Sequence, residues 1–203
     1  MIRRTMLPLV AGVCMLVGAG SAQAATSQHY SVRGTLAEAG FDSQSGCIDT
    51  SAYVFGGIGR VKQTGKPASN SEIDVYVSRY DVCNEQSVSF AWGSIQPSGD
   101  ELRIDKRLDS ATLDATVPVT DYDGNTVPLQ VDVTWQGVGD AVKERGRSQY
   151  STAGFKEMSS FSGVFRDANA SGTISDGQTD YSPEPAQWAE LGKNSYTDIT
   201  ITH

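Results

Sequence analysis

Oxygen-bearing side chains at alternate positions after residue 166 form the pattern with the most specific chemistry in the sequence. Asp167, Asn169 and Ser171 occupy the first, third and fifth positions of a calcium-loop pattern, and a glycine follows at the sixth. Hard oxygen ligands at this spacing are what Ca²⁺ requires in such a loop. The twelfth position, however, is Gln178, where a bidentate glutamate is required. A calcium site at these residues is therefore one hypothesis, and an ordinary strand with polar side chains is the other.

Positive charge is concentrated in the polar stretch 137–157, which contains Lys143, Arg145 and Arg147. Such a cluster on an acidic protein could bind an anionic partner or a polysaccharide. The stretch is also rich in glycine and has no apolar periodicity, which is typical of a solvated, mobile loop. We predict a loop here, and the three cations are candidate ligand-binding residues.

Aromatic side chains on a sheet face could stack on sugar rings. Trp92 and Trp135 fall on the apolar phase of their predicted strands, so we expect both to lie in the core. Trp188 lies outside any clear alternation and is expected to be exposed. It is therefore the aromatic candidate for ligand binding.

Histidine is scarce, and this limits the chemistry. The chain has two, His29 and His203, and neither lies in a patterned segment. Serine–histidine hydrolases, histidine-ligated zinc enzymes and cysteine–histidine proteases are therefore improbable. Paired carboxylates need no histidine, so a glycoside hydrolase or lyase stays open, although no pair can be nominated from one sequence. Apart from calcium we expect no cofactor.

The first 24 residues have the layout of a cleavable secretory signal. Arg3 and Arg4 precede an apolar run at 7–17, and small residues at Ala22 and Ala24 mark the cleavage site. We therefore expect residues 25–203 to form one secreted domain, extracellular or periplasmic, with no transmembrane segment after cleavage. The net charge is −8, with no basic stripe interleaved with aromatics, so nucleic acid is not an expected partner.

Two cysteines, Cys47 and Cys83, follow the predicted signal segment. An even pair in an oxidising compartment predicts a disulfide. A bridge closing a loop of this length would stabilise the fold by about 3–4 kcal/mol in the chain-entropy model.

Period-two alternation is the main structural signal, and it is clearest in residues 110–135. Two alternating apolar runs there are separated by a turn containing Asp123 and Gly124, which predicts a hairpin. Shorter alternating runs occur at 30–36, 72–80, 88–92, 161–165 and 197–201, and 185–191 could be a short helix or a strand. We count about nine strands. They predict an antiparallel two-sheet β-sandwich, immunoglobulin-like or jelly-roll-like, with a closed β-barrel as the alternative.

We therefore expect a non-enzymatic binding or surface-interaction module, with a polysaccharide or a cell-surface component as its partner. The first alternative is the carboxylate enzyme. The second is a self-associating structural or toxin-like surface protein.

Overall fold

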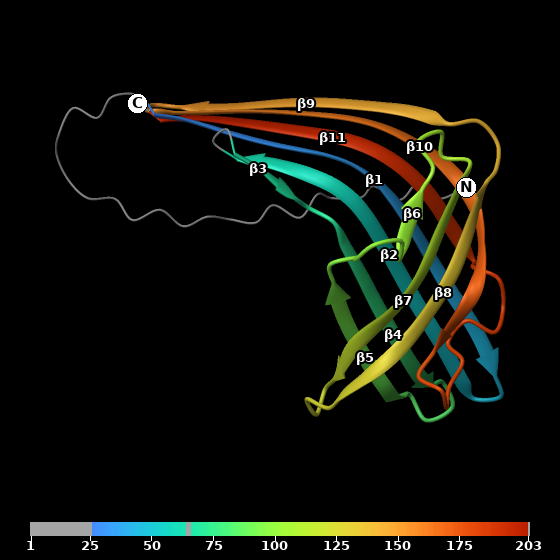
Figure 1. Ribbon diagram of the computed structural model, residues 1–203. Helices are drawn as coiled ribbons and strands as arrows, with labels where there is room; N and C mark the ends of the chain where they lie inside the picture. Colours follow the sequence, from blue (N-terminus) through green and yellow to red (C-terminus); the bar gives the residue numbers. More distant parts are fainter. Residues whose placement is uncertain (1–25, 64–65, 203) are drawn as a thin grey trace.

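The computed structural model describes residues 26–63 and 66–202, so the predicted signal segment lies outside the described residues. All of the regular structure in this range is β, in eleven strands (Figure 1). Their bounds are β1 (Thr26–Ser45), β2 (Ile48–Gln63), β3 (Lys66–Ser69), β4 (Glu72–Asp81), β5 (Gln86–Ile95), β6 (Leu102–Ile104), β7 (Ser110–Asp121), β8 (Thr126–Gly137), β9 (Val142–Thr152), β10 (Phe155–Ser175) and β11 (Trp188–Thr202). In this part of the chain no helix is long and apolar enough to cross a membrane.

Hydrogen bonds join all of these strands into one antiparallel sheet. The order is β1-β11-β10-β8-β7-β5-β4-β2-β3, with β6 on β7 and β9 on β10. In addition β1 pairs with β2 along most of its length, so the order returns to its first strand. The predicted all-β class and antiparallel pairing are confirmed, but the division into two sheets is not.

The predicted central hairpin is present at the expected position. Strands β7 and β8 pair from Ser110 opposite Gln136 to Thr120 opposite Thr126. Gly124 in the turn has a φ of 83°, which a glycine adopts without steric cost. The alternating apolar residues of both strands are buried except Val127, beside the turn, and Trp135, as expected, is fully buried.

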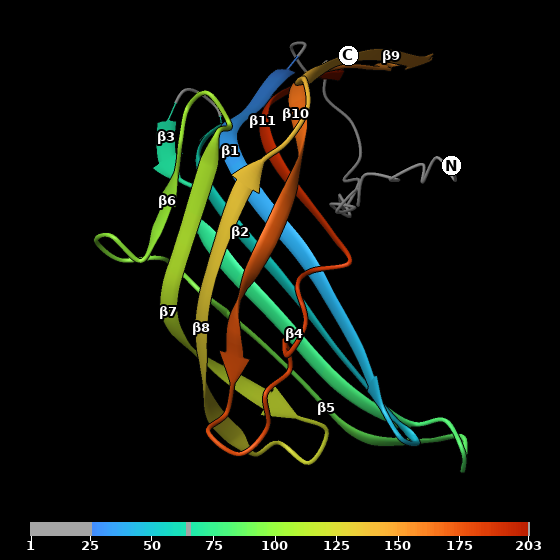
Figure 2. The same ribbon diagram turned by 90° about the vertical axis from the view of Figure 1, so that its right-hand side faces the viewer.

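The sheet curves so that one of its faces is enclosed (Figure 2). Within residues 26–63 and 66–202 no other sheet or helix covers that face, so it must be buried by the sheet wrapping around it. The largest fully buried side chains come from strands on all sides: Trp135, Phe41, Ile73, Leu113, Leu129, Ile174 and Leu191. We call this wrapped part the body.

Six strand segments continue beyond the body as a single extended layer, seen projecting sideways in Figure 1. In pairing order β9-β10-β11-β1-β2-β3, they are residues 142–152, 155–165, 192–202, 26–36, 57–63 and 66–69. Most of their side chains are exposed or half-buried, including every residue of β9. We call this layer the arm.

The arm overturns one prediction and refines another. The stretch 137–157, predicted to be a loop, is mostly strand β9 and the start of β10. The loop prediction failed because a strand with solvent on both faces needs no apolar alternation. The ambiguous stretch 185–191 contains no helix and becomes the start of β11 at Trp188.

The predicted disulfide is present. Cys47, in the turn between β1 and β2, is bonded to Cys83, in the turn between β4 and β5. The two turns also share a backbone hydrogen bond, in which the N–H of Val82 donates to the carbonyl of Cys47 over 2.8 Å.

Candidate functional site

One face of the arm is strongly basic. Residues paired directly across antiparallel strands point to the same face. The registers therefore place Arg145, Arg33 and Arg60 in one row, and Arg147 and Lys62 in the next row on the same face. This face is continuous with the buried face of the body, since Ala37 follows Arg33 at the same alternation. We call it the basic face.

The basic face has positive charge without compensation. Of the 16 lysines and arginines in the chain, it carries Arg33, Arg60, Lys62, Lys143, Arg145, Arg147, Lys156 and Lys193. The acidic residues of the arm, Glu144, Glu157 and Asp198, all lie on its opposite face. None of the eight cations has a salt-bridge partner within the described residues. A local positive potential therefore exists on a protein whose net charge is −8.

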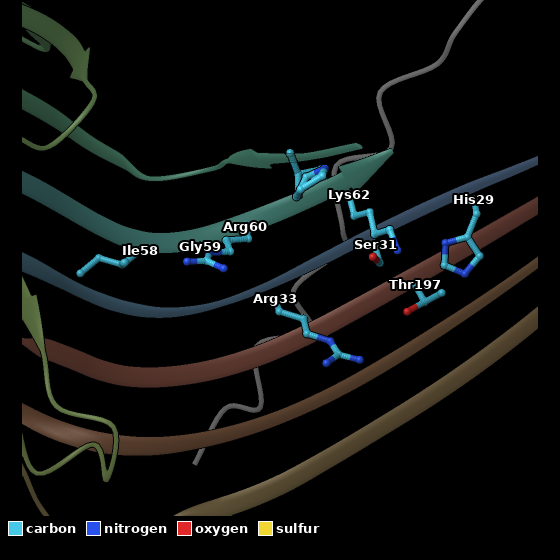
Figure 3. Close-up of a pocket in the computed structure, with 10 residues that line it drawn as sticks. His29, Ser31, Arg33, Ile58, Gly59, Arg60, Lys62 and Thr197 are labelled. Carbon is cyan, nitrogen blue, oxygen red and sulfur yellow. The ribbon is translucent and has the colours of Figure 1, made fainter. Parts of the chain in front are cut away.

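Hydroxyl groups fill the middle of this face. Ser160, Ser162, Ser195, Thr197 and Ser31 lie between the cations of β9 and those of β1 and β2. A pocket opens over the inner part, lined by the side chains of His29, Ser31, Arg33, Ile58, Arg60, Lys62, Pro67 and Thr197. Figure 3 shows the labelled side chains over β2, β1 and β11. The face thus offers cationic and neutral hydrogen-bond donors together.

The structure separates the predicted ligand-binding residues into two groups. Lys143, Arg145 and Arg147 lie together on the basic face, whereas Trp188 lies on the opposite face of the sheet. Sequence reasoning missed the cations that complete the face, chiefly Arg33, Arg60, Lys62 and Lys193. They belong to three other strands, and the one available signal was that Arg33 interrupts an otherwise neutral alternating run.

Trp188 belongs to a row of aromatic side chains that crosses five strands on the outside of the body. Trp188 pairs with Gly40, Gly40 with Tyr53, Tyr53 with Tyr76, and Tyr76 with Trp92. Successive ring centroids are 5.9, 6.0 and 6.5 Å apart. We call Trp188, Tyr53, Tyr76 and Trp92 the aromatic row.

The members of the row are accessible to solvent. Trp92 is 51% exposed, Tyr76 41% and Trp188 37%. The prediction that Trp92 is a core residue is therefore wrong. In β5 the small residues Ala91 and Gly93 face inward with Ile95, whereas Phe90 and Trp92 face outward.

Three carboxylates lie beside one another near the Trp188 end of this row. The registers place Asp167, Glu190 and Glu38 opposite one another on β10, β11 and β1. Burial, and then the charges of Glu38, Asp167 and Glu144, raise the pKa of Glu190 to about 7. Burial also raises the pKa of Glu38, although its carboxylate accepts a hydrogen bond from the Tyr53 hydroxyl at 2.9 Å. Burial, and then the charge of Glu38 and this hydrogen bond, raise the pKa of Tyr53.

The predicted calcium ligands lie on an extended strand. Asp167, Asn169 and Ser171 are exposed residues of β10, alternating with the buried Ala168 and Ala170. Outward side chains two residues apart on a strand are separated by about 6.8 Å, so these do not converge as they would in a loop. The calcium hypothesis stays untested. Among the described residues, the close grouping of metal-ligand side chains is Cys47, Asp81 and Cys83, and its two thiols are used in the disulfide.

No protein-family model matches the chain, and no curated protein is significantly similar to it. Among solved structures, an AttH candidate from Nitrosomonas europaea is 12% identical over 87% of this chain and 51% of that chain, with a TM-score of 0.25. The match thus spans about half of that longer protein, and at this TM-score it carries no argument about fold or function.

Proposed function

We propose that the protein is a non-enzymatic binding module whose basic face takes up an acidic polysaccharide outside the reducing cytoplasm. The observation that carries the proposal is the set of eight cations without an acidic neighbour on one face of the arm. The disulfide supports a location in an oxidising compartment.

The arrangement suits a polymer better than a small ligand. The cations of β9 lie three strand spacings from Arg33 on β1 and four from those on β2, or about 14 and 19 Å. A chain lying across the arm would contact both groups and the serine and threonine hydroxyls between them. Carboxylate or sulfate groups would pair with the guanidinium groups, and sugar hydroxyls would bond to Ser31, Ser162 and Thr197.

An anionic membrane surface offers the same charge, but it suits this face less well. Surface-binding elements insert a continuous apolar face beneath the cations. Here most of the residues between the cations are hydroxylated, and the apolar side chains are divided: Val164 and Ile58 lie at the inner end of the face, and Met158, Ile199 and Ile201 lie at the outer end. The hydroxyls favour a ligand that itself carries hydroxyl groups.

Removing three cations from the pocket tests the proposal. The triple variant Arg33→Ser, Arg60→Ser, Lys62→Ser should bind heparin and polygalacturonate about tenfold more weakly, since exposed ionic contacts each contribute about 0.5 kcal/mol. The matched control, Arg79→Ser, Arg103→Ser, Lys106→Ser, removes the same charge elsewhere and should bind as the parent does. Calorimetric titration at two salt concentrations measures the affinity of each variant and how far salt weakens it.

Two results would contradict the proposal. In one, both triple variants lose affinity equally, which would mean that only the net charge matters. In the other, phosphatidylglycerol vesicles bind and both polysaccharides do not, which would assign the face to a membrane surface. Dextran, a neutral polymer, serves as the blank.

A carboxylate enzyme is the second candidate, and the pairing of Glu38 with Glu190 favours it. Side chains directly opposite one another have Cβ atoms about 5 Å apart, and two carboxyl groups at such separations can act as acid and nucleophile. Glu190, with a pKa of about 7, would be the proton donor. If the protein is such an enzyme, its incubation with a polysaccharide should produce new reducing ends, and the Glu190→Gln variant should produce none. If the parent protein shows no turnover, the carboxylate-enzyme candidate is excluded.

A further inference from the structure

We infer that the aromatic row is a second binding site, for a neutral polysaccharide, on the opposite side of the sheet from the basic face. The inference does not depend on the acidic-polysaccharide proposal, because the two surfaces share no residue. It rests on three observations. Four aromatic rings are aligned across five strands, Gly40 leaves space for the indole of Trp188, and polar groups flank the row on both sides.

The row is built into the backbone. A Cβ atom at position 40 would lie 2.3 Å from the indole nitrogen of Trp188, so the indole lies directly over Gly40. A larger residue there would separate Trp188 from Tyr53, whose ring centroid is 5.9 Å away. Tyr53 is itself held by its hydrogen bond to buried Glu38. The rings therefore form a preorganised surface, which lowers the entropic cost of binding.

The edges of the row carry hydrogen-bonding groups. One flanking row contains Asp74 and Ser94, and the other contains Asp42, Ser51 and Ser78. At the Trp188 end, a second pocket is lined by Asp42, Ser43, Gln44 and Gln187 among others. Flat apolar rings bordered by hydroxyl, amide and carboxylate groups match a pyranose, which has apolar faces and hydroxylated edges.

The charges beside the row decide the class of ligand. Asp42, Asp74 and Glu38 would repel an acidic polymer, so the occupant expected here is neutral. Two copies meeting face to face through this row would also bring their own carboxylates together. A polymer with neutral sugar units avoids both conflicts.

The test uses intrinsic tryptophan fluorescence and calorimetry with cellohexaose, mannohexaose, chitohexaose and maltohexaose. At least one should bind with a dissociation constant below 1 mM, and Trp92→Ala should weaken that binding at least tenfold. Gly40→Val, which leaves all four aromatics in the chain, should weaken it as well. Tyr150→Ala, which removes a 60% exposed ring from β9, is the matched control and should bind as the parent does.

Failure of this inference can be distinguished from failure of the acidic-polysaccharide proposal, because each surface has its own variant. Arg33→Ser, Arg60→Ser, Lys62→Ser should leave neutral-sugar binding unchanged, and Trp92→Ala should leave heparin binding unchanged. The inference is overturned if none of the four hexasaccharides binds, or if Trp92→Ala binds as tightly as the parent. It is also overturned if sedimentation over a concentration series shows a dimer that Trp92→Ala abolishes, since the row would then be an interface between copies.

Discussion

Glu190 and Glu38 face each other across two paired strands; Glu38 is buried and Glu190 is half-buried. An ionised carboxyl is disfavoured by burial and by a neighbouring negative charge. Both causes act on Glu190, whose pKa rises to about 7. The folded protein therefore holds a proton on this side chain at pH values where the unfolded chain has released it.

We predict that stability falls as the pH rises from about 4.5 to about 7. In this window the folded state binds more protons than the unfolded state, so the free energy of unfolding decreases with pH. Allowing for solvent screening, Glu190 should contribute about 1–2 kcal/mol less stability at pH 8 than at pH 5. Urea unfolding at both values should show this difference in the parent, and Glu190→Gln should abolish that contribution.

The control for this titration is Asp114→Asn, which changes an exposed carboxyl on β7. Its pH dependence should follow that of the parent. If the pH dependence of Glu190→Gln also follows that of the parent, the carboxyl of Glu190 is more accessible to solvent than its pairing with Glu38 indicates.

Strand β9 shows what alternation could and could not predict at the scale of elements. Hydrophobic alternation arises where one face of a strand is buried, as in β7 and β8, and both were predicted with their turn. Every residue of β9 is exposed, including Val142 and Tyr150, so its mostly polar sequence has no clear alternation and is indistinguishable from a loop. The cations of the basic face could not be assembled from the sequence, because they lie on several strands whose pairing joins residues far apart in the chain.

Strand β5 misled the prediction for a different reason. Its large apolar residues, Val88, Phe90 and Trp92, alternate as a core strand would, yet they face away from the core. The inward residues Ala91 and Gly93 are small where β5 approaches β7 closely: a Cβ atom at Gly93 would lie 2.2 Å from the carbonyl oxygen of Pro118. Backbone proximity between strands cannot be inferred from one sequence, so the exposed aromatic row was missed.

This contact gives a prediction about the sheet. Two residue pairs, Ala91 with Asp121 and Trp92 with Thr120, make up the pairing between β5 and β7. Gly93→Ala should force these strands apart and destabilise the protein by about 1–3 kcal/mol, lowering the melting temperature by about 3–10 °C. Gly146→Ala, on an exposed strand with nothing within 4 Å of the new methyl group, should change it by less than about 1 °C. Equal effects in the two variants would mean that β5 and β7 can separate at no cost.

At the scale of the molecule, the disulfide and the basic face lie at opposite ends. The turns that hold Cys47 and Cys83 close the lower end of the body, and the arm extends from the upper end (Figures 1 and 2). The disulfide was predictable because two cysteines leave a single pairing. The arm was not, because its strands depend on neighbours far away in the sequence.

Reduction should therefore lower stability and leave ligand binding intact. The bridge spans 36 residues, a loop whose closure is worth about 3–4 kcal/mol in the chain-entropy model. Part of that effect duplicates the pairing of Ile48 with Asp81 and the hydrogen bond from Val82 to Cys47, so we expect a melting temperature about 5–10 °C lower in reductant. Heparin affinity at 25 °C should be unchanged, because the alternating strands still bury the core and no cation of the arm contacts the bridge. A Cys47→Ser, Cys83→Ser variant should reproduce both results. Loss of heparin binding at a temperature where the reduced protein is still folded would show that the two ends of the sheet are coupled.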